Sequence, residues 1–298
     1  MLRTALQWHR PLVVFGLAMA ALIPVTLIGL VADDRVLTGT PIWFKPLKFS
    51  ISFVLYSFTL AWFLTFLDGR LRRFGRWAGT IITAASAIEM SVIVGQVIRG
   101  KRSHFNFETP LDGALFSVMG ATIVVLWVMH AAIAILLLRA KFENQALAWS
   151  VRLGLIVAFF GLGVAFLMIG PKPGQDMKAG IIGAHSVGAP DGGSYMALTG
   201  WSTEAGDLRV PHFIGMHAVQ VLPVLIALLG RWATVRLVWV LGAGYLGVLA
   251  LTTWQALRGQ SLIHPDSITL LAFAALVAAT ALGVVWARTE THKELVAA

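Results

Sequence analysis

The sequence predicts an all-α integral membrane protein with eight transmembrane helices. Of its residues, 58% are hydrophobic and only 12% charged, and the mean hydropathy is +0.80. Soluble domains are nearer half apolar and a quarter charged. The apolar residues also fall into runs of about 20, the length that crosses a bilayer as a helix. The runs cover residues 11–31, 47–67, 77–98, 114–138, 153–170, 211–229, 237–257 and 268–287.

The net charge of +9 gives an isoelectric point near 10.5. The basic residues stand in short clusters between the apolar runs, where they set topology, so we expect a lipid bilayer as partner and no nucleic acid. An even number of spans places both termini on one side, and that side carries most of the net positive charge. We therefore expect cytoplasmic termini in a bacterial plasma membrane. The sequence has no cysteine, which excludes disulfides, thiolate catalysis and Cys-ligated metals.

The ends of the third and seventh spans are alike. One reads Gln96-Val-Ile-Arg99-Gly100 and the other Gln255-Ala-Leu-Arg258-Gly259. Because they lie four spans apart, they suggest a 4+4 parallel repeat with halves 1–140 and 150–298. Chance similarity is the alternative interpretation.

A long loop, 171–210, precedes the sixth span. Structureless loops of this length are uncommon in compact proteins and are usually functional or disordered. The loop is rich in glycine and proline, but it also contains apolar residues that can pack. We therefore expect a folded lid on the outer face of the helices.

The sixth span contains His217 near its outer end. Gln220 lies one turn below it on the same helix face. Polar groups inside a span are functional candidates because they are costly there without a partner. A packed histidine bonded to a neighbouring carbonyl is the alternative.

One hypothesis for this region is a metal site rich in nitrogen and oxygen ligands, which suits zinc, copper or iron. The candidate ligands are His217, His212, His185, His104 and His264.

A second hypothesis is haem b, with His217 as an axial ligand and Arg258 as a further contact. His130 is the other intramembrane histidine, and it lies too far from the outer ends of the spans to pair with His217. We expect His130 to be packed or to face lipid.

A third hypothesis needs no metal. Arginine guanidinium groups bind anions through paired hydrogen bonds. A small or lipid-soluble anionic substrate could then be held by Asp207, Arg209, Arg99 and Arg258.

The third span also contains an acidic residue, Glu89, two turns below Gln96 on the same face. A carboxyl group at this depth indicates a proton path or a cation site. A neutral glutamic acid bonded to a neighbouring helix is the alternative.

Several stretches carry a resemblance to known proteins. They are Lys45-Pro-Leu-Lys-Phe-Ser, Arg99-Gly-Lys-Arg-Ser-His-Phe-Asn, Ala184-His-Ser-Val-Gly and Gly206-Asp-Leu-Arg-Val-Pro-His-Phe-Ile-Gly-Met-His. They resemble an uncharacterised family of bacterial polytopic membrane proteins, which implies no particular activity. The outline of eight spans with outer histidines is also similar to haem A synthase. The Glu-x-x-His-Arg-type signature expected there is absent, so no residue roles are transferred.

Together these observations favour a metal- or haem-dependent membrane oxidoreductase with a site on the outer face. The alternative hypothesis is a transporter or permease that uses Glu89 and the outer arginines.

Overall fold

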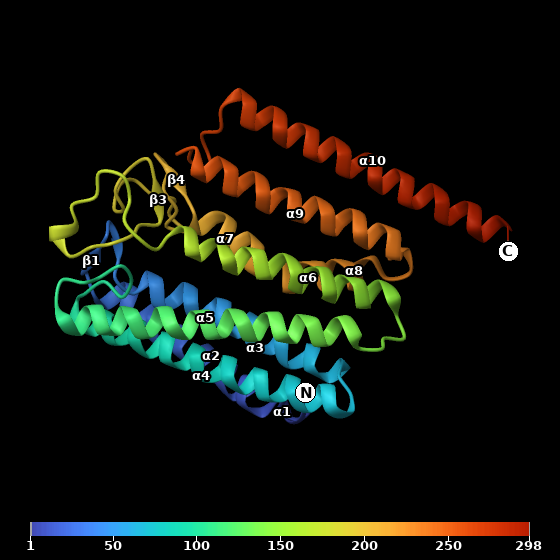
Figure 1. The fold of residues 1–298 in the computed structure, drawn as a ribbon, viewed down its shortest axis with the longest axis horizontal. Coiled ribbons are helices and arrows are strands. Elements are labelled where there is room, and N and C mark those ends of the chain that lie inside the picture. The colour runs from blue at the N-terminus through green and yellow to red at the C-terminus, as the bar shows by residue number, and fades with distance from the viewer. Residues whose placement is uncertain (1, 298) are drawn as a thin grey trace. The chain divides into compact units, whose positions relative to one another are not determined.

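A computed structural model describes residues 2–297, with the side chains of 177 and 290–297 excepted. Residues 1 and 298 lie outside the described residues, and the expectation of cytoplasmic termini concerns them. The chain forms two compact units, and each contains its own group of helices (Figure 1). Unit 1 contains Met1–Ala140, Phe166–His185 and Pro190–Gly200, and unit 2 contains Lys141–Ala165, Ser186–Ala189 and Trp201–Ala298.

Unit 1 is built on five α-helices. They are α1 (Leu2–Trp8), α2 (Arg10–Ala32), α3 (Phe44–Phe63), α4 (Gly69–Arg99) and α5 (Pro110–Arg139). A short 3₁₀ helix, η1 (Leu64–Phe66), extends α3, and the hairpin of β1 (Val36–Leu37) and β2 (Thr40–Pro41) precedes it. Helix α2 packs mainly on α3, and α4 packs mainly on α5. The core between them is formed by Phe15, Met19, Phe53, Met90, Ile93 and Met119.

Unit 2 is also built on five α-helices. They are α6 (Gln145–Gly163), α7 (Arg209–Met216), α8 (Ala218–Leu229), α9 (Val235–Leu257) and α10 (Ser267–Ala297). Strands β3 (Ser186–Val187) and β4 (Gly206–Asp207) pair antiparallel. The remaining short 3₁₀ helices of the chain are η2 (Val164–Leu167), η3 (Met177–Ala179) and η4 (Gly230–Trp232). Helix α6 packs on α7, α8 and α9, and α10 packs on α9.

Several helix starts are fixed by side chains in the sequence. The side-chain oxygens of Thr109, Asn144 and Thr234 accept hydrogen bonds from the first free backbone N–H groups of α5, α6 and α9. Proline stands in the first turn of α2 and of α5, where its missing N–H costs nothing. The loops between spans therefore end at defined residues.

The fold class is confirmed: the protein is all-α with the composition of a membrane protein. Seven helices of the described chain are long and apolar enough to cross a membrane, and α7 with α8 makes an eighth span if the bent pair counts as one. The predicted runs match these helices within a few residues at most ends. Helix α10 is only 6% buried over its apolar window, which suits a helix that faces lipid.

The sixth span differs from the prediction. The sequence predicts one helix over 211–229, whereas the chain bends by 46° between α7 and α8 at His217. The hydroxyl of Tyr245 donates to the carbonyl of Ile214 at 2.7 Å, which satisfies a backbone group beside the break. His212 and His217 therefore do not lie on one straight helix.

Two glycines explain how α6 lies against the bend. A Cβ on Gly161 would collide with the backbone of Gly215, and a Cβ on Gly215 would collide with that of Gly161. The two backbones can be this close only because both residues lack side chains.

We expect Gly161→Ala to destabilise the protein by about 1–3 kcal/mol, because the added methyl group would force α6 away from α7. Gly120→Ala is the matched control, since a Cβ at Gly120 meets nothing within 4 Å. Thermal unfolding in detergent should show a lower melting temperature for Gly161→Ala alone. Equal melting temperatures for the two variants would contradict the close packing at Gly161.

Candidate functional site

The candidate site in unit 1 is centred on a buried carboxyl group. Glu89 lies on α4 among apolar positions and is 1% exposed. Its Oε1 atom is 3.5 Å from Nε2 of His104, at the outer limit of a hydrogen bond. Its Oε2 atom is buried and has no hydrogen-bond partner among the described residues.

His104 reaches this depth because the loop after α4 turns back on itself. Gly100 ends the helix in the left-handed conformation, at φ 70°. Phe105 also has a positive φ, 62°, which is unusual for an aromatic residue. The buried amide of Asn106 holds this turn, donating to the carbonyl of Arg102 and accepting from the N–H of Glu108.

Part of the long loop supports the same turn. The N–H of Phe107 donates to the carbonyl of Gly180, and the N–H of Ile182 donates to the carbonyl of Phe105. The side chain of Gln175 bonds to both backbone groups of Gly183 at 3.0 Å. Within unit 1, residues 166–185 are thus hydrogen-bonded to the loop that carries His104.

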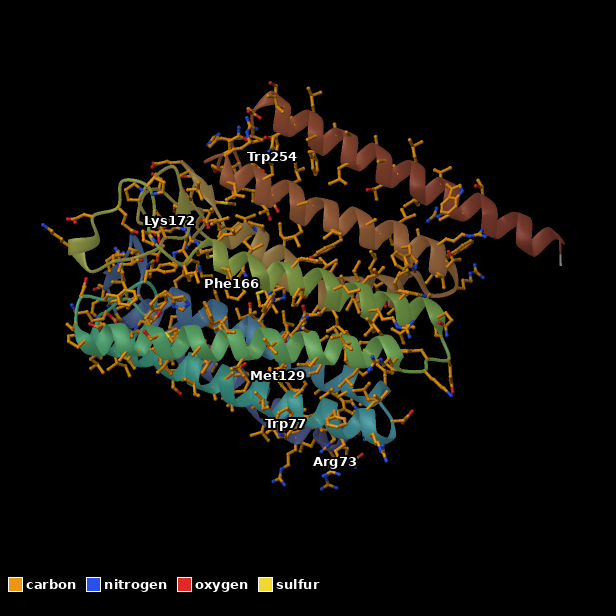
Figure 2. The ribbon with its side chains drawn as sticks, viewed as in Figure 1. Arg73, Trp77, Met129, Phe166, Lys172 and Trp254 are labelled. Atoms are coloured by element: carbon orange, nitrogen blue, oxygen red, sulfur yellow. The ribbon has the colours of Figure 1, made fainter. Side chains whose placement is uncertain are left out.

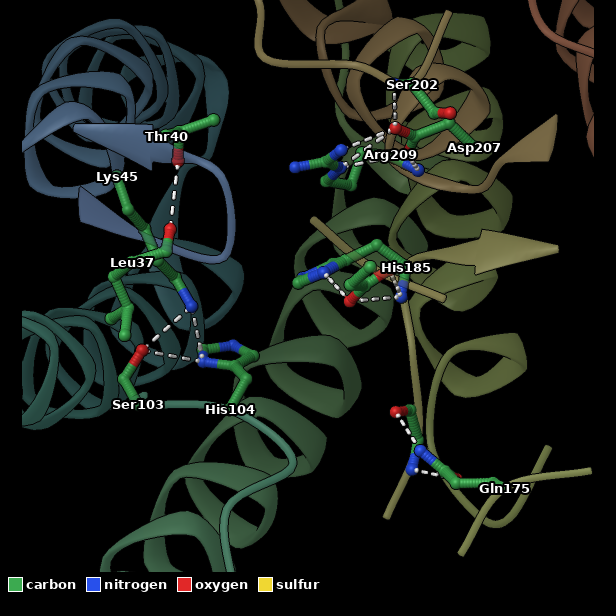
Figure 3. A network of polar contacts seen from close by, with 12 residues as sticks. Leu37, Thr40, Lys45, Ser103, His104, Gln175, His185, Ser202, Asp207 and Arg209 are labelled. Carbon is green, nitrogen blue, oxygen red and sulfur yellow. Dashed lines mark hydrogen bonds and ion pairs between the residues drawn. The ribbon is translucent and has the colours of Figure 1, made fainter. Parts of the chain in front are cut away.

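Lys45 approaches the other side of the imidazole from the first turn of α3 (Figure 3). Its Nζ atom lies 2.9 Å from Nδ1 of His104 and 2.8 Å from the Oγ atom of Ser103. An ammonium group can only donate, so Nδ1 accepts and the imidazole carries its proton on Nε2. That proton faces Glu89.

The rings of Phe49, Phe105 and Phe116 surround His104, with centroids 5.9–6.3 Å from that of the imidazole. They pack around the imidazole and restrict its orientation. Exposure falls from the half-buried Lys45, through His104 at 23%, to Glu89 at 1%. The three side chains therefore form a line from the protein surface into the buried part of α4.

The arginine at the end of α4 is engaged locally. Nη1 of Arg99 donates to the carboxylate of Asp112 at 2.7 Å, and Nε2 of Gln96 donates to the same oxygen at 2.9 Å. The Gln96 amide also donates to the carbonyl six residues later. These contacts form the Gln96 network (Gln96, Arg99, Asp112).

The seventh span ends in the same way. Arg258 pairs with Asp266 at 2.6 Å, and Nε2 of Gln255 donates to the carbonyl of Ser261, again six residues later. Gly259, like Gly100, has a left-handed conformation. We call these contacts the Gln255 network (Gln255, Arg258, Asp266).

A second pair of similar turns occurs before α3 and before α7. In each, an arginine forms a forked ion pair with the aspartate two residues earlier, Arg35 with Asp33 and Arg209 with Asp207. Matching turns in the two units favour the 4+4 repeat, which stays a prediction.

These pairings bear on the anion-binding hypothesis. Arg99, Arg209 and Arg258 each pair with a nearby carboxylate, that of Asp112, Asp207 or Asp266, and each pair ties together two neighbouring parts of the chain. Outside the spans, Arg258 holds the pKa of Asp266 well below its usual range, and Arg35 does the same for Asp33. Because both pKa values are lowered, these pairs are intact at neutral pH and are lost only in strong acid.

The predicted histidines occupy separate environments. His185 pairs with Asp191 at 2.8 Å, His212 bonds to the carbonyl of Gly161 at 2.9 Å, and His264 is exposed. His217 bonds to Oε1 of Gln220 at 3.1 Å, as their spacing predicts. Among the described residues, no group of three or more His, Asp or Glu side chains could hold a metal ion.

His130 is packed, as one of the two interpretations expects. It is fully buried, and its Nδ1 atom lies 2.9 Å from the hydroxyl of Tyr56.

The sequence did not predict the contacts of Lys45 with Ser103 and His104, or the ion pair of Asp112 with Arg99. The available signal was a pair of lysines, Lys45 and Lys48, at the start of a mostly apolar helix, because charged groups on a membrane helix need polar partners.

No family model, curated protein or solved structure matches the chain. The resemblance to the bacterial membrane family and, in outline, to haem A synthase thus stays a prediction.

We expect Asp112→Asn to destabilise the protein by about 1–3 kcal/mol, because it leaves buried donors of the Gln96 network without their charged acceptor. Asp266→Asn is the matched variant in the Gln255 network, and its effect should be smaller because Asp266 is partly exposed. Thermal unfolding of both variants measures the difference. A larger loss for Asp266→Asn would contradict this assignment.

Proposed function

We propose that the protein is a proton-coupled transporter, or permease, of the bacterial plasma membrane. The two termini would be cytoplasmic, and the line Lys45–His104–Glu89 would connect Glu89 to the outer side. The observation that carries the proposal is a carboxyl group buried in a span and linked to the surface by a histidine and a lysine. Ionisable groups in membrane segments are rare and characteristic of proton relays.

The proposed proton transfer is balanced. The Lys45 ammonium gives a proton to Nδ1 of His104 while the Nε2 proton passes to Glu89. The products are a neutral lysine, the other neutral tautomer of histidine and a protonated glutamic acid. Lys45 is half-buried, so it can regain its proton from water outside.

This transfer suits the surroundings of the site. It converts a positive and a negative group into two neutral ones, and separated charges are costly where water is scarce. A protonated Glu89 can also donate a hydrogen bond, whereas the ionised form only accepts. Proton binding therefore changes what Glu89 can contact, which is the property that a coupled transporter needs.

The broken sixth span supports transport independently. Discontinuous helices are typical of transporters, in which the helix ends at the break bind substrate or coupling ions. His217 stands at the break between α7 and α8, and the nearby Nε2 atom of Gln220 is buried without a partner among the described residues. We assign a small or lipid-soluble substrate to this region.

The other hypothesis, a metal- or haem-dependent oxidoreductase, rests on the sequence alone. His104, His185, His212 and His217 have the separate partners given above, and among the described residues no group of three or more His, Asp or Glu side chains could hold a metal ion.

Glu89→Gln tests the proposal directly. A pH jump applied to proteoliposomes on a solid-supported membrane should produce a transient current as Glu89 takes up its proton. Gln has a similar shape but does not titrate, so we expect the current to vanish while the protein still folds. Glu108→Gln is the control, because Glu108 pairs with Lys101 at 37% exposure. An unchanged current in Glu89→Gln would contradict the proposal.

His104→Phe should slow proton uptake on the order of 100-fold, because phenylalanine keeps the packing among the three rings but cannot pass a proton. His264→Phe changes an exposed histidine and should leave the rate unaltered. The rise time of the same current gives both rates. If the two variants behave alike, His104 is not part of the path.

A further inference from the structure

An apolar groove lies between α4 and α5 at the end of unit 1 where α4 begins. It has a volume of about 280 Å³ and no charged residue in its lining. Phe74 and Trp77 line it from α4, and Ala132, Ile135 and Leu136 line it from α5. Phe74 and Trp77 are 60% and 62% exposed, so the groove opens outward from the helices.

Arginines continue both walls of the groove toward its end. On α4, Arg73 and Arg70 precede Trp77 by four and seven residues, which places them within about 40° of it around the helix. On α5, Arg139 follows Ile135 by four residues and so shares its face. Figure 2 shows Arg73 projecting away from the helices next to Trp77.

The charges of these arginines are not neutralised. Arg70, Arg73 and Arg139 are exposed, and within the described part of the chain none of them makes an ion pair. The segment 68–77 contains one acidic residue, Asp68, at the N-cap of α4. By contrast, Arg76 is only half-exposed and donates to the carbonyl of Trp8.

We propose that this groove binds one acyl chain of an anionic phospholipid, whose phosphate is held by Arg70, Arg73 and Arg139. The occupant follows from charge complementarity: an apolar channel ending in unpaired arginines matches an acyl chain ending in a phosphate. Such arginines favour anionic over zwitterionic headgroups. This site is independent of the proposed proton transfer.

The test compares two neighbouring arginines. Arg73 and Arg72 are both exposed, but Arg72 lies about 140° from Trp77 around the helix, away from the groove. Native mass spectrometry of the detergent-purified protein would measure binding of dioleoylphosphatidylglycerol. We expect Arg73→Gln to weaken binding about fivefold and Arg72→Gln to leave it unchanged. Equal losses would indicate a diffuse surface charge and overturn the proposal.

Two further measurements separate the groove from a simple anion site. Ala132→Phe fills the groove while keeping every arginine, and it should reduce binding of phosphatidylglycerol as strongly as Arg73→Gln. Dioleoylphosphatidylcholine has the same phosphate but also a cationic choline that repels the arginines, so it should bind more weakly than phosphatidylglycerol and should lose less affinity in Arg73→Gln. Full binding by Ala132→Phe, or displacement of the lipid by soluble glycerol phosphate at equal concentration, would overturn the proposal.

Discussion

The cost of burying Glu89 is the constraint on which the candidate site of unit 1 depends. A carboxyl group on a membrane helix needs a partner, and no residue of α4 itself supplies one. The partner comes from a loop that must turn back sharply, with Phe105 at a positive φ and Asn106 buried to hold the turn. Residues 166–185 then pair with that loop. The local structure is thus arranged around one ionisable group.

A comparison of the two units shows which features around Glu89 are particular to unit 1. The Gln96 and Gln255 networks hold the chain after their helices in the same way. Such a network therefore does not by itself require a buried acid. Seven residues before Gln96 stands Glu89, whereas seven before Gln255 stands Val248. Eight residues after each glutamine, His104 corresponds to Ile263. At these two pairs of positions, an acid and a histidine occur only in unit 1. This difference favours a functional over a structural reason for Glu89 and His104.

Much of the fold could be predicted because apolar runs and cap residues act locally. The contact between His217 and Gln220 was likewise predictable from helix geometry. The break at His217 was not predicted, and the close approach of Gly161 and Gly215 beside it joins residues that are far apart in sequence. The contact of His104 with Glu89, and that of Lys45 with His104, were missed because the three side chains come from different elements. Spacing predicts contacts along one helix and says little about loops that fold back.

Infrared difference spectroscopy across a pH change detects protonation of Glu89 itself, because the C=O stretch of a protonated carboxyl group is separate from the carboxylate bands. We expect one such band, from a buried group, to appear on acidification in the native protein and in Glu108→Gln but to be missing in Glu89→Gln. A Glu89 band that does not change with pH, or identical difference spectra in all three proteins, would contradict this expectation.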